Sequence, residues 1–155
     1  MTSLLLPSFF LSLIGFFNIF GIRQSLSLNQ IFYIAMGFLL FFICKKIGGN
    51  FFAANTKFFY WLFVFILILT FIIGLEVRGS RRWIDLYLFN FQGSEIFKAF
   101  FILFFANFFA RDYRIENPGK IFLWSLVFLL IPVFIIFKQP DLGNAGVFLI
   151  IYIVI

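Results

Sequence analysis

Long apolar runs alternate with short polar segments along the whole chain. Each of the first five runs approaches the ~20 apolar residues that a helix needs to cross a bilayer core. The sixth run would give only ~21 Å of helix at ~1.5 Å per residue, which is short of a span. The pattern predicts an all-α, polytopic integral membrane helix bundle with five complete transmembrane helices and part of a sixth. The predicted runs are roughly 4–22, 30–47, 57–75, 94–110, 119–137 and 142–155.

The segments between these runs are short and polar, so none is long enough to form a separate soluble domain. Short links also make sequential helices antiparallel neighbours. A natural membrane protein seldom ends in the middle of the hydrocarbon, so we expect residues 1–155 to be the N-terminal part of a single, longer transmembrane domain. The connectors are Arg23–Asn29, Gly48–Thr56, Glu76–Gly93, Arg111–Pro118 and Lys138–Asp141.

Several helix boundaries have a local chemical signal. Asn117 can cap the fifth helix, with Pro118 at its first position, where a missing N–H has no consequence. Pro132 lies inside that helix and should kink it. Pro140 is expected to begin the sixth helix, with Asp141 in its first turn, where the helix dipole favours a negative charge.

Composition narrows the class of protein. The chain is 64% hydrophobic and 12% charged, with 12 basic and 6 acidic residues. The basic residues are spread over short loops, which fits membrane lipids better than nucleic acid. There is no histidine and only one cysteine, Cys44. Imidazole chemistry, a disulfide and a metal site are therefore not predicted. No cofactor is evident, and the sequence leaves open whether a divalent cation is needed.

Basic residues also bear on orientation. With six alternating spans, a cytoplasmic N-terminus places six basic residues in inside loops and five in outside loops, which favours that orientation by the positive-inside rule. The inside set is Lys45, Lys46, Lys57, Arg111, Arg114 and Lys120, and the outside set is Arg23, Arg78, Arg81, Arg82 and Lys138.

The segment GSRRWIDLYLFNFQGSEIFK, residues 79–98, concentrates charge between two apolar runs. Charge near a membrane boundary is costly and is commonly kept for a function. Arg81 and Arg82 beside Trp83 suit a phosphate or pyrophosphate at the level of the lipid headgroups. Interfacial anchoring by the tryptophan is the alternative explanation.

Gln92 precedes a second charged group at the start of the fourth apolar run. Glu95 and Lys98 are three residues apart, so they share one face of a helix and can pair. Lys98 falls about one turn into the apolar run and is expected to face a cavity or a partner. The alternative is an acidic helix start with a lysine that extends its amine to the interface.

Two further polar groups follow. KQPDLGN, residues 138–144, contains Gln139 and Asp141 and lies on the same side of the membrane as the first two groups, although a turn and helix start would also explain it. Arg111–Arg114 lies on the opposite side and is typical of a topology-setting loop. Three groups on one face indicate a site for an amphiphile with an anionic head and a lipid tail, but no reaction follows from spacing alone.

The strings GSRRWIDL, FNFQGSEIFK and KQPDLGNAG together resemble the signature of the SEDS family, whose members RodA, FtsW and SpoVE serve shape, elongation, division and sporulation. The family pattern is G-[AS]-x-R-W-[IL]-x-L, then F-Q-P-S-E-x-x-K, then Q-P-D-[LF]-G-T. Order and spacing agree, and Asp85 with the leucine of QPDLG leans towards RodA. Two positions depart: Gly93 replaces a proline and Asn144 replaces a threonine.

The resemblance implies a peptidoglycan glycosyltransferase of the bacterial inner membrane. Such enzymes polymerise lipid II, a disaccharide-pentapeptide on undecaprenyl pyrophosphate, and work with a class B penicillin-binding protein. The family's proposed catalytic aspartate lies on a later outer loop, so no catalytic residue is expected within these 155 residues, which alone should be inactive. A division or sporulation homologue, a lipid-linked precursor transporter and a non-catalytic scaffold are the alternatives.

The resemblance also implies roles for matching positions. Arg82 would contact the pyrophosphate or brace the outer loop, and Trp83 would anchor that loop. Glu95 and Lys98 would line a polar cavity. The full set of substrate-binding or cavity-lining candidates is Arg81, Arg82, Trp83, Gln92, Glu95, Lys98, Gln139 and Asp141.

Overall fold

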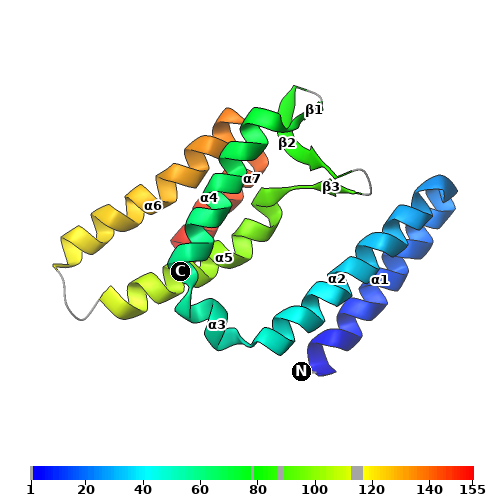
Figure 1. Cartoon of the computed structure of the whole chain (residues 1–155), viewed down its shortest axis with the longest axis horizontal. Coiled ribbons are helices and arrows are strands. Elements are labelled where there is room, and N and C mark those ends of the chain that lie inside the picture. The colour runs from blue at the N-terminus through cyan, green and yellow to red at the C-terminus, as the bar shows by residue number, and fades with distance from the viewer. Residues whose placement is uncertain (1, 78, 87–88, 113–116) are drawn as a thin grey trace. The chain divides into compact units, whose positions relative to one another are not determined.

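The computed structural model describes residues 2–77, 79–86, 89–112 and 117–155, which form two compact units, Met1–Gly48 and Gly49–Ile155 (Figure 1). In the described part of the chain, five helices are long and apolar enough to cross a membrane, and a shorter apolar helix follows them. The prediction of five complete spans and part of a sixth is therefore confirmed.

The first unit is a helical hairpin. Helix α1, Thr2–Ile22, is followed by the short 3₁₀ helix η1, Gln24–Leu26, and by α2, Ser27–Ile47. Helix α2 begins three residues before its predicted start, because η1 leads directly into it and the Ser27 hydroxyl donates to the Gln24 carbonyl oxygen at 2.7 Å. Large apolar side chains are exposed along both helices, as expected of helices that lipid surrounds.

The second unit contains five helices and a small sheet. Helix α4 packs against α5 and α6, and α7 packs against the same two helices. The short helix α3 lies in the connector that follows the second apolar run, where no helix was predicted. The helices are α3 Gly49–Ala54, α4 Thr56–Ile73, α5 Gly93–Asp112, α6 Pro118–Lys138 and α7 Leu142–Val154.

Aromatic side chains fill the core of this unit. Tyr60 on α4 is fully buried and stacks on Phe104 of α5, with ring centroids 4.3 Å apart. Phe101 of α5 meets Phe148 of α7 edge to face at 4.9 Å. Such stacked and edge-to-face arrangements are the favourable geometries for aromatic pairs. Aromatic side chains that face inward therefore hold α4, α5 and α7 together.

One hydrogen bond in this core compensates for a proline. Pro132 has no N–H, so the carbonyl of Phe128, four residues earlier in α6, lacks its helical donor. The Tyr60 hydroxyl donates to that carbonyl oxygen at 2.6 Å. A polar group that would be costly to leave unpaired in hydrocarbon is thus satisfied from the neighbouring helix.

A three-stranded antiparallel sheet replaces the polar loop predicted over residues 76–93. It consists of β1 Leu75–Val77, β2 Ser80–Asp85 and β3 Asn90–Phe91, in the order β1-β2-β3. Glu76 pairs with Arg81 across β1 and β2. The third apolar run was predicted to continue to residue 75, but α4 ends at Ile73 and Leu75 enters the sheet. The sheet lies where α4 ends and α5 begins (Figure 1), and we call this the sheet end.

Two predicted helix starts can be compared with the structure. Asn117 caps α6 through a bond from the Gly119 N–H, with Pro118 in the first helical position, as predicted. Helix α7 begins at Leu142, so the prediction that Pro140 starts it was wrong. Asp141 is the residue before the helix, and its carboxylate accepts from the Asn144 N–H, which is how an N-cap residue acts.

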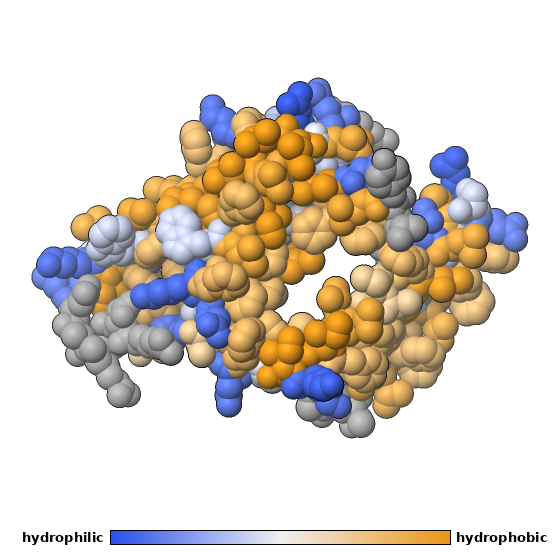
Figure 2. Space-filling model, viewed as in Figure 1, coloured by the Kyte–Doolittle hydropathy of each residue, from blue (hydrophilic) through white to orange (hydrophobic). Residues whose placement is uncertain are grey.

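The surface follows the same division between apolar spans and polar ends. Apolar side chains cover most of the visible helical surface in Figure 2, and hydrophilic ones gather mainly near helix ends. The structure is consistent with a polytopic membrane protein whose polar chemistry lies at the membrane boundaries.

The bond between Tyr60 and the Phe128 carbonyl gives a testable prediction. Tyr60→Phe should lower the free energy of unfolding in detergent by about 1 kcal/mol, in the range of hydrogen bonds between membrane helices. In a Pro132→Ala background the same substitution should cost less, because residue 132 then has an N–H for the Phe128 carbonyl.

Tyr152→Phe is the matched control, because the Tyr152 hydroxyl pairs with that of Ser125 at 2.6 Å and not with the carbonyl that Pro132 leaves free. Its cost should be equal in both backgrounds. An equal cost for Tyr60→Phe in both backgrounds would contradict this explanation of the bond.

Candidate functional site

Three separate segments meet at a carboxylate at the sheet end. Arg82 of β2 places its Nη1 atom 3.3 Å from Oδ1 of Asp141, which precedes α7. Gln92, just before α5, donates from Nε2 to Oδ2 of Asp141 at 3.4 Å. Three residues predicted to lie on one face of the membrane are thus brought together, although 59 and 49 positions separate the bonded pairs.

Asp141 is almost completely enclosed, with a side-chain exposure of 5%. Its two oxygens accept bonds from Arg82 and Gln92 and also from the backbone N–H and the Nδ2 of Asn144, the last at 2.8 Å. A buried charge is tolerated when such donors surround it. The carboxylate therefore joins these segments through hydrogen bonds and is not positioned to act as a general base.

Sequence reasoning missed two members of this group. Asn144 was included in the group at residues 138–144 and noted as a departure from the family pattern, but it was given no role; it donates to Asp141 and approaches Ser94 at 3.5 Å. Ser94 is buried, with 3% exposure. The available signal was positional: residue 144 is the third residue of a helix capped by an aspartate, where its N–H and side chain both reach the cap.

Arg81 lies apart from this group. Successive residues of a strand point to opposite faces, so β2 separates the guanidinium of Arg81 from that of Arg82. Arg81 instead donates from Nε and Nη2 to one carboxylate oxygen of Glu76, at 3.2 and 3.1 Å, and both side chains are at least half exposed. The two arginines therefore do not form one joint grip in this structure.

Glu95 and Lys98 form the predicted pair in the first turns of α5. The Lys98 amine lies 2.8 and 2.9 Å from the two carboxylate oxygens of Glu95. Lys98 is the more enclosed partner, with 23% side-chain exposure against 52% for Glu95. The lysine that enters the apolar run thus has its charge balanced within its own helix.

Gln139 and Trp83 support the sheet end in different ways. Gln139 is buried in the turn after α6 and donates from Nε2 to the carbonyl oxygen of Leu67 in α4 at 2.8 Å. It therefore fastens the end of α6 to α4 rather than joining the Asp141 group. Trp83 is partly buried and pairs with Leu75 across the sheet.

The glycine that departs from the family pattern has a packing context. A Cβ atom at Gly93 would come within 2.7 Å of Cγ2 of Ile66, which is closer than nonbonded carbon atoms approach. A proline at this position would need Ile66 to move. Glycine at position 93 therefore fits the position of the Ile66 side chain of α4.

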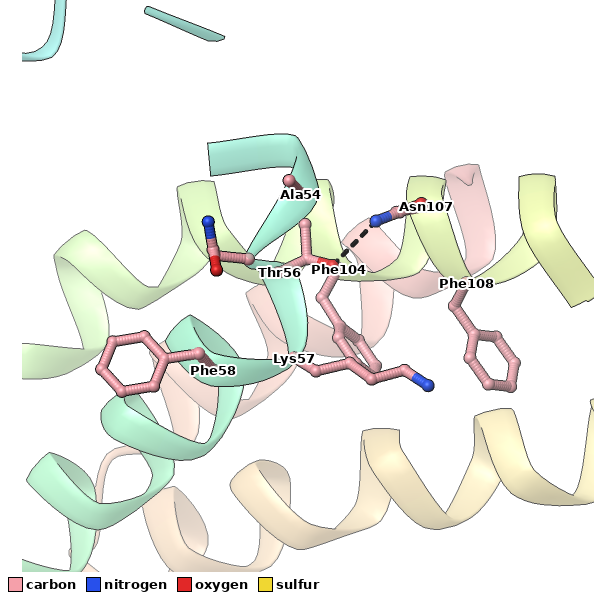
Figure 3. Close-up of a pocket in the computed structure, with 8 residues that line it drawn as sticks. Ala54, Thr56, Lys57, Phe58, Phe104, Asn107 and Phe108 are labelled. Atoms are coloured by element: carbon pink, nitrogen blue, oxygen red, sulfur yellow. Dashed lines mark hydrogen bonds between the residues drawn. The ribbon is translucent and has the colours of Figure 1, made fainter. Parts of the chain in front are cut away.

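A pocket of about 280 Å³ lies at the start of α4, which is the end opposite the sheet (Figure 3). Asn107 of α5 points towards Thr56, and its Nδ2 donates to the Thr56 hydroxyl at 2.9 Å and to the Ala53 carbonyl oxygen at 2.7 Å. One amide thereby ties α5 to the junction between α3 and α4. Lys57 and Phe108 also line the pocket, which was not predicted from the sequence.

In the described part of the chain, no three carboxylate or thiol side chains gather into a group that could hold a metal ion. The side chains of Arg111–Arg114 and of Arg78 lie outside the described residues.

Comparison with known proteins identifies the family to which this chain belongs. The family model described as cell cycle protein, FtsW/RodA/SpoVE, matches residues 3–155. The probable peptidoglycan glycosyltransferase FtsW of Buchnera aphidicola subsp. Schizaphis graminum is 30% identical over 75% of this chain and 33% of its own length. The peptidoglycan glycosyltransferase MrdB of Helicobacter pylori is 33% identical over 94% of this chain and 40% of its own length.

The fold agrees with a solved structure. The crystal structure of the rod shape determining protein RodA of Thermus thermophilus superposes with a TM-score of 0.86 at 24% identity, over 96% of this chain and 50% of that one. The chain spans about a third of the length of the curated relatives described above. Because the family model covers nearly the whole sequence, the chain belongs to the FtsW/RodA/SpoVE family of cell cycle proteins.

Proposed function

We propose that the whole protein is a RodA-like peptidoglycan glycosyltransferase that joins the sugars of lipid II into glycan strands. The observation that carries the proposal is the family match over residues 3–155, together with relatives whose names state this activity. The fold is the same as that of RodA. In this proposal, residues 1–155 belong to a single transmembrane domain, and the bond-making groups lie elsewhere in the whole protein.

The proposed topology places the N-terminus in the cytoplasm and the sheet end at the outer surface of the bacterial inner membrane. The charge distribution favours this orientation. Lipid II presents its sugars and its pyrophosphate at that surface. A class B penicillin-binding protein is the proposed partner, and the resemblance of the sequence motifs supports it.

The site residues receive the following proposed roles. Arg82 and Asp141 brace the sheet against the start of α7, because Nη1 of Arg82 lies 3.3 Å from Oδ1 of Asp141. Gln92 and Gln139 fasten the same end of the bundle. We propose that Glu95 and Lys98 face a polar cavity of the whole protein as a balanced pair, and that Trp83 anchors the sheet at the interface.

The direct test is polymerisation by the whole protein. The whole protein, expressed and purified, should convert lipid II into glycan polymer. Gel electrophoresis should resolve this polymer, and a muramidase should digest it. Retention of all lipid II as monomer, with and without the proposed partner, would contradict the proposal. Movement of lipid II across vesicle membranes without polymer would instead favour a transporter.

A second prediction concerns the brace. In the whole protein, Asp141→Asn keeps the helix cap and removes the charge that Arg82 contacts. It should lower the free energy of unfolding by about 1 kcal/mol, a value reduced because the Arg82 side chain is 35% exposed and partly screened. It should also raise the lipid II concentration needed for half-maximal rate more than it lowers the maximal rate.

Arg82→Ala should act in the same direction as Asp141→Asn, and the double variant should be little worse than either alone, because both remove one contact. Arg23→Ala removes an exposed arginine side chain from the first unit and serves as the control. Additive losses in the double variant would show that the two residues act independently.

A further inference from the structure

A pocket of about 240 Å³ lies at the sheet end on the side that Arg81 faces. Its walls come from β1, β2, the end of α4 and the turn after α6. The lining includes Phe71, Glu76, Arg81, Lys138 and Gln139. None of these residues contributes to the Asp141 group, so this pocket is distinct from the brace described above.

The charges in this pocket are unbalanced. Two cations, Arg81 and Lys138, face one carboxylate, Glu76, which leaves a formal charge of +1. Both bonds from Arg81 go to a single oxygen of Glu76, and Nη1 of Arg81 has no partner among the described residues. An exposed ion pair of this kind contributes little, so a second anion that also contacts Lys138 can compete with Glu76 for the guanidinium.

Lys138 has no anionic partner among the described residues. Its amine lies 5.5 Å from the ring centroid of Phe134, and the described ion pairs are those of Arg81, Arg82 and Lys98. Lysines at the ends of membrane helices extend to the headgroup level, where lipid phosphates are found. The amine is therefore available to an anion from the membrane.

The shape of the pocket suits an amphiphile. Gln139 is buried and fixed by its bond to the Leu67 carbonyl, which gives one rigid polar wall. Phe71, at the end of α4, is 43% exposed and offers an apolar wall that continues towards the membrane-spanning part of the helix. A phosphate placed between the two cations would leave its attached chain beside Phe71.

We infer that this pocket binds the phosphate head of a membrane lipid through Arg81 and Lys138. The lipid is a phosphodiester phospholipid or a polyprenyl phosphate, since both present an anionic phosphate on an apolar chain. Glu76 holds Arg81 in place when the lipid is absent and competes with the phosphate for it. The inference stands independently of the proposed glycosyltransferase activity.

The test measures lipid binding to the whole protein in detergent by native mass spectrometry, with phosphatidylglycerol, undecaprenyl phosphate and inorganic phosphate as separate probes. Arg81→Gln and Lys138→Gln should each weaken binding of the lipid probes by about fivefold, the effect of one basic residue near an anionic lipid. Lys138→Arg should retain binding. Lys120→Gln, at the other end of α6, is the matched control and should change nothing.

Glu76→Gln should change lipid binding in the opposite direction to the other two substitutions, which a merely structural role would not produce. It removes the competing carboxylate and should tighten binding of both lipid probes. Weaker or unchanged binding in this variant would overturn the inference, as would an equal loss in Lys120→Gln or binding of inorganic phosphate as tight as that of the lipids. The tighter of the two lipid probes identifies the source of the phosphate.

The same preparations separate this inference from the proposed function. If the unsubstituted protein fails to polymerise lipid II while Arg81→Gln and Lys138→Gln still weaken lipid binding, the glycosyltransferase proposal fails and the lipid site stands. If polymerisation occurs and the variants bind lipid as the unsubstituted protein does, the lipid site fails alone.

Discussion

The carboxylate of Asp141 is the point at which the sheet end is held together. It is buried, and its oxygens accept from β2, from the residue before α5 and from the first turn of α7. A buried anion without donors is strongly destabilising, so these groups must converge for the chain to be folded. The position of β2 beside the start of α7 follows from this requirement, and the alternation of side chains along the strand then turns Arg81 away from Arg82.

The helices were predictable because the bilayer imposes their length. About 20 apolar residues in succession have few alternatives to a membrane helix, and the predicted runs agree with the observed helices to within a few residues. Asn117 with Pro118 also gave a correct start for α6, since capping depends on neighbouring residues alone. The pairing of Glu95 with Lys98 was predictable for the same reason, because three residues along a helix bring two side chains together.

The sheet and the Asp141 group depended on contacts that sequence spacing does not specify. Strand β2 shows no strict alternation of apolar and polar residues, and its partners are set by pairing with β1 and β3. The residues Arg82 and Asp141 were singled out, but their bond spans 59 positions and required the three-dimensional arrangement. Tyr60 as the partner of the Phe128 carbonyl emerged only from helix packing. The Asp141 cap and its donor Asn144 are only three residues apart, so they had a local signal in the sequence.

The pairing of Glu95 with Lys98 has a consequence for how the protein enters the membrane during synthesis. Helix α5 is the least hydrophobic of the five long spans in the described part of the chain, with a mean hydropathy of 1.4. Because its two opposite charges neutralise each other within a single turn, α5 can leave the translocon without waiting for a later segment to balance them. The contact between Arg82 and Asp141, in contrast, depends on a later segment. It can form only after the ribosome has synthesised the start of α7.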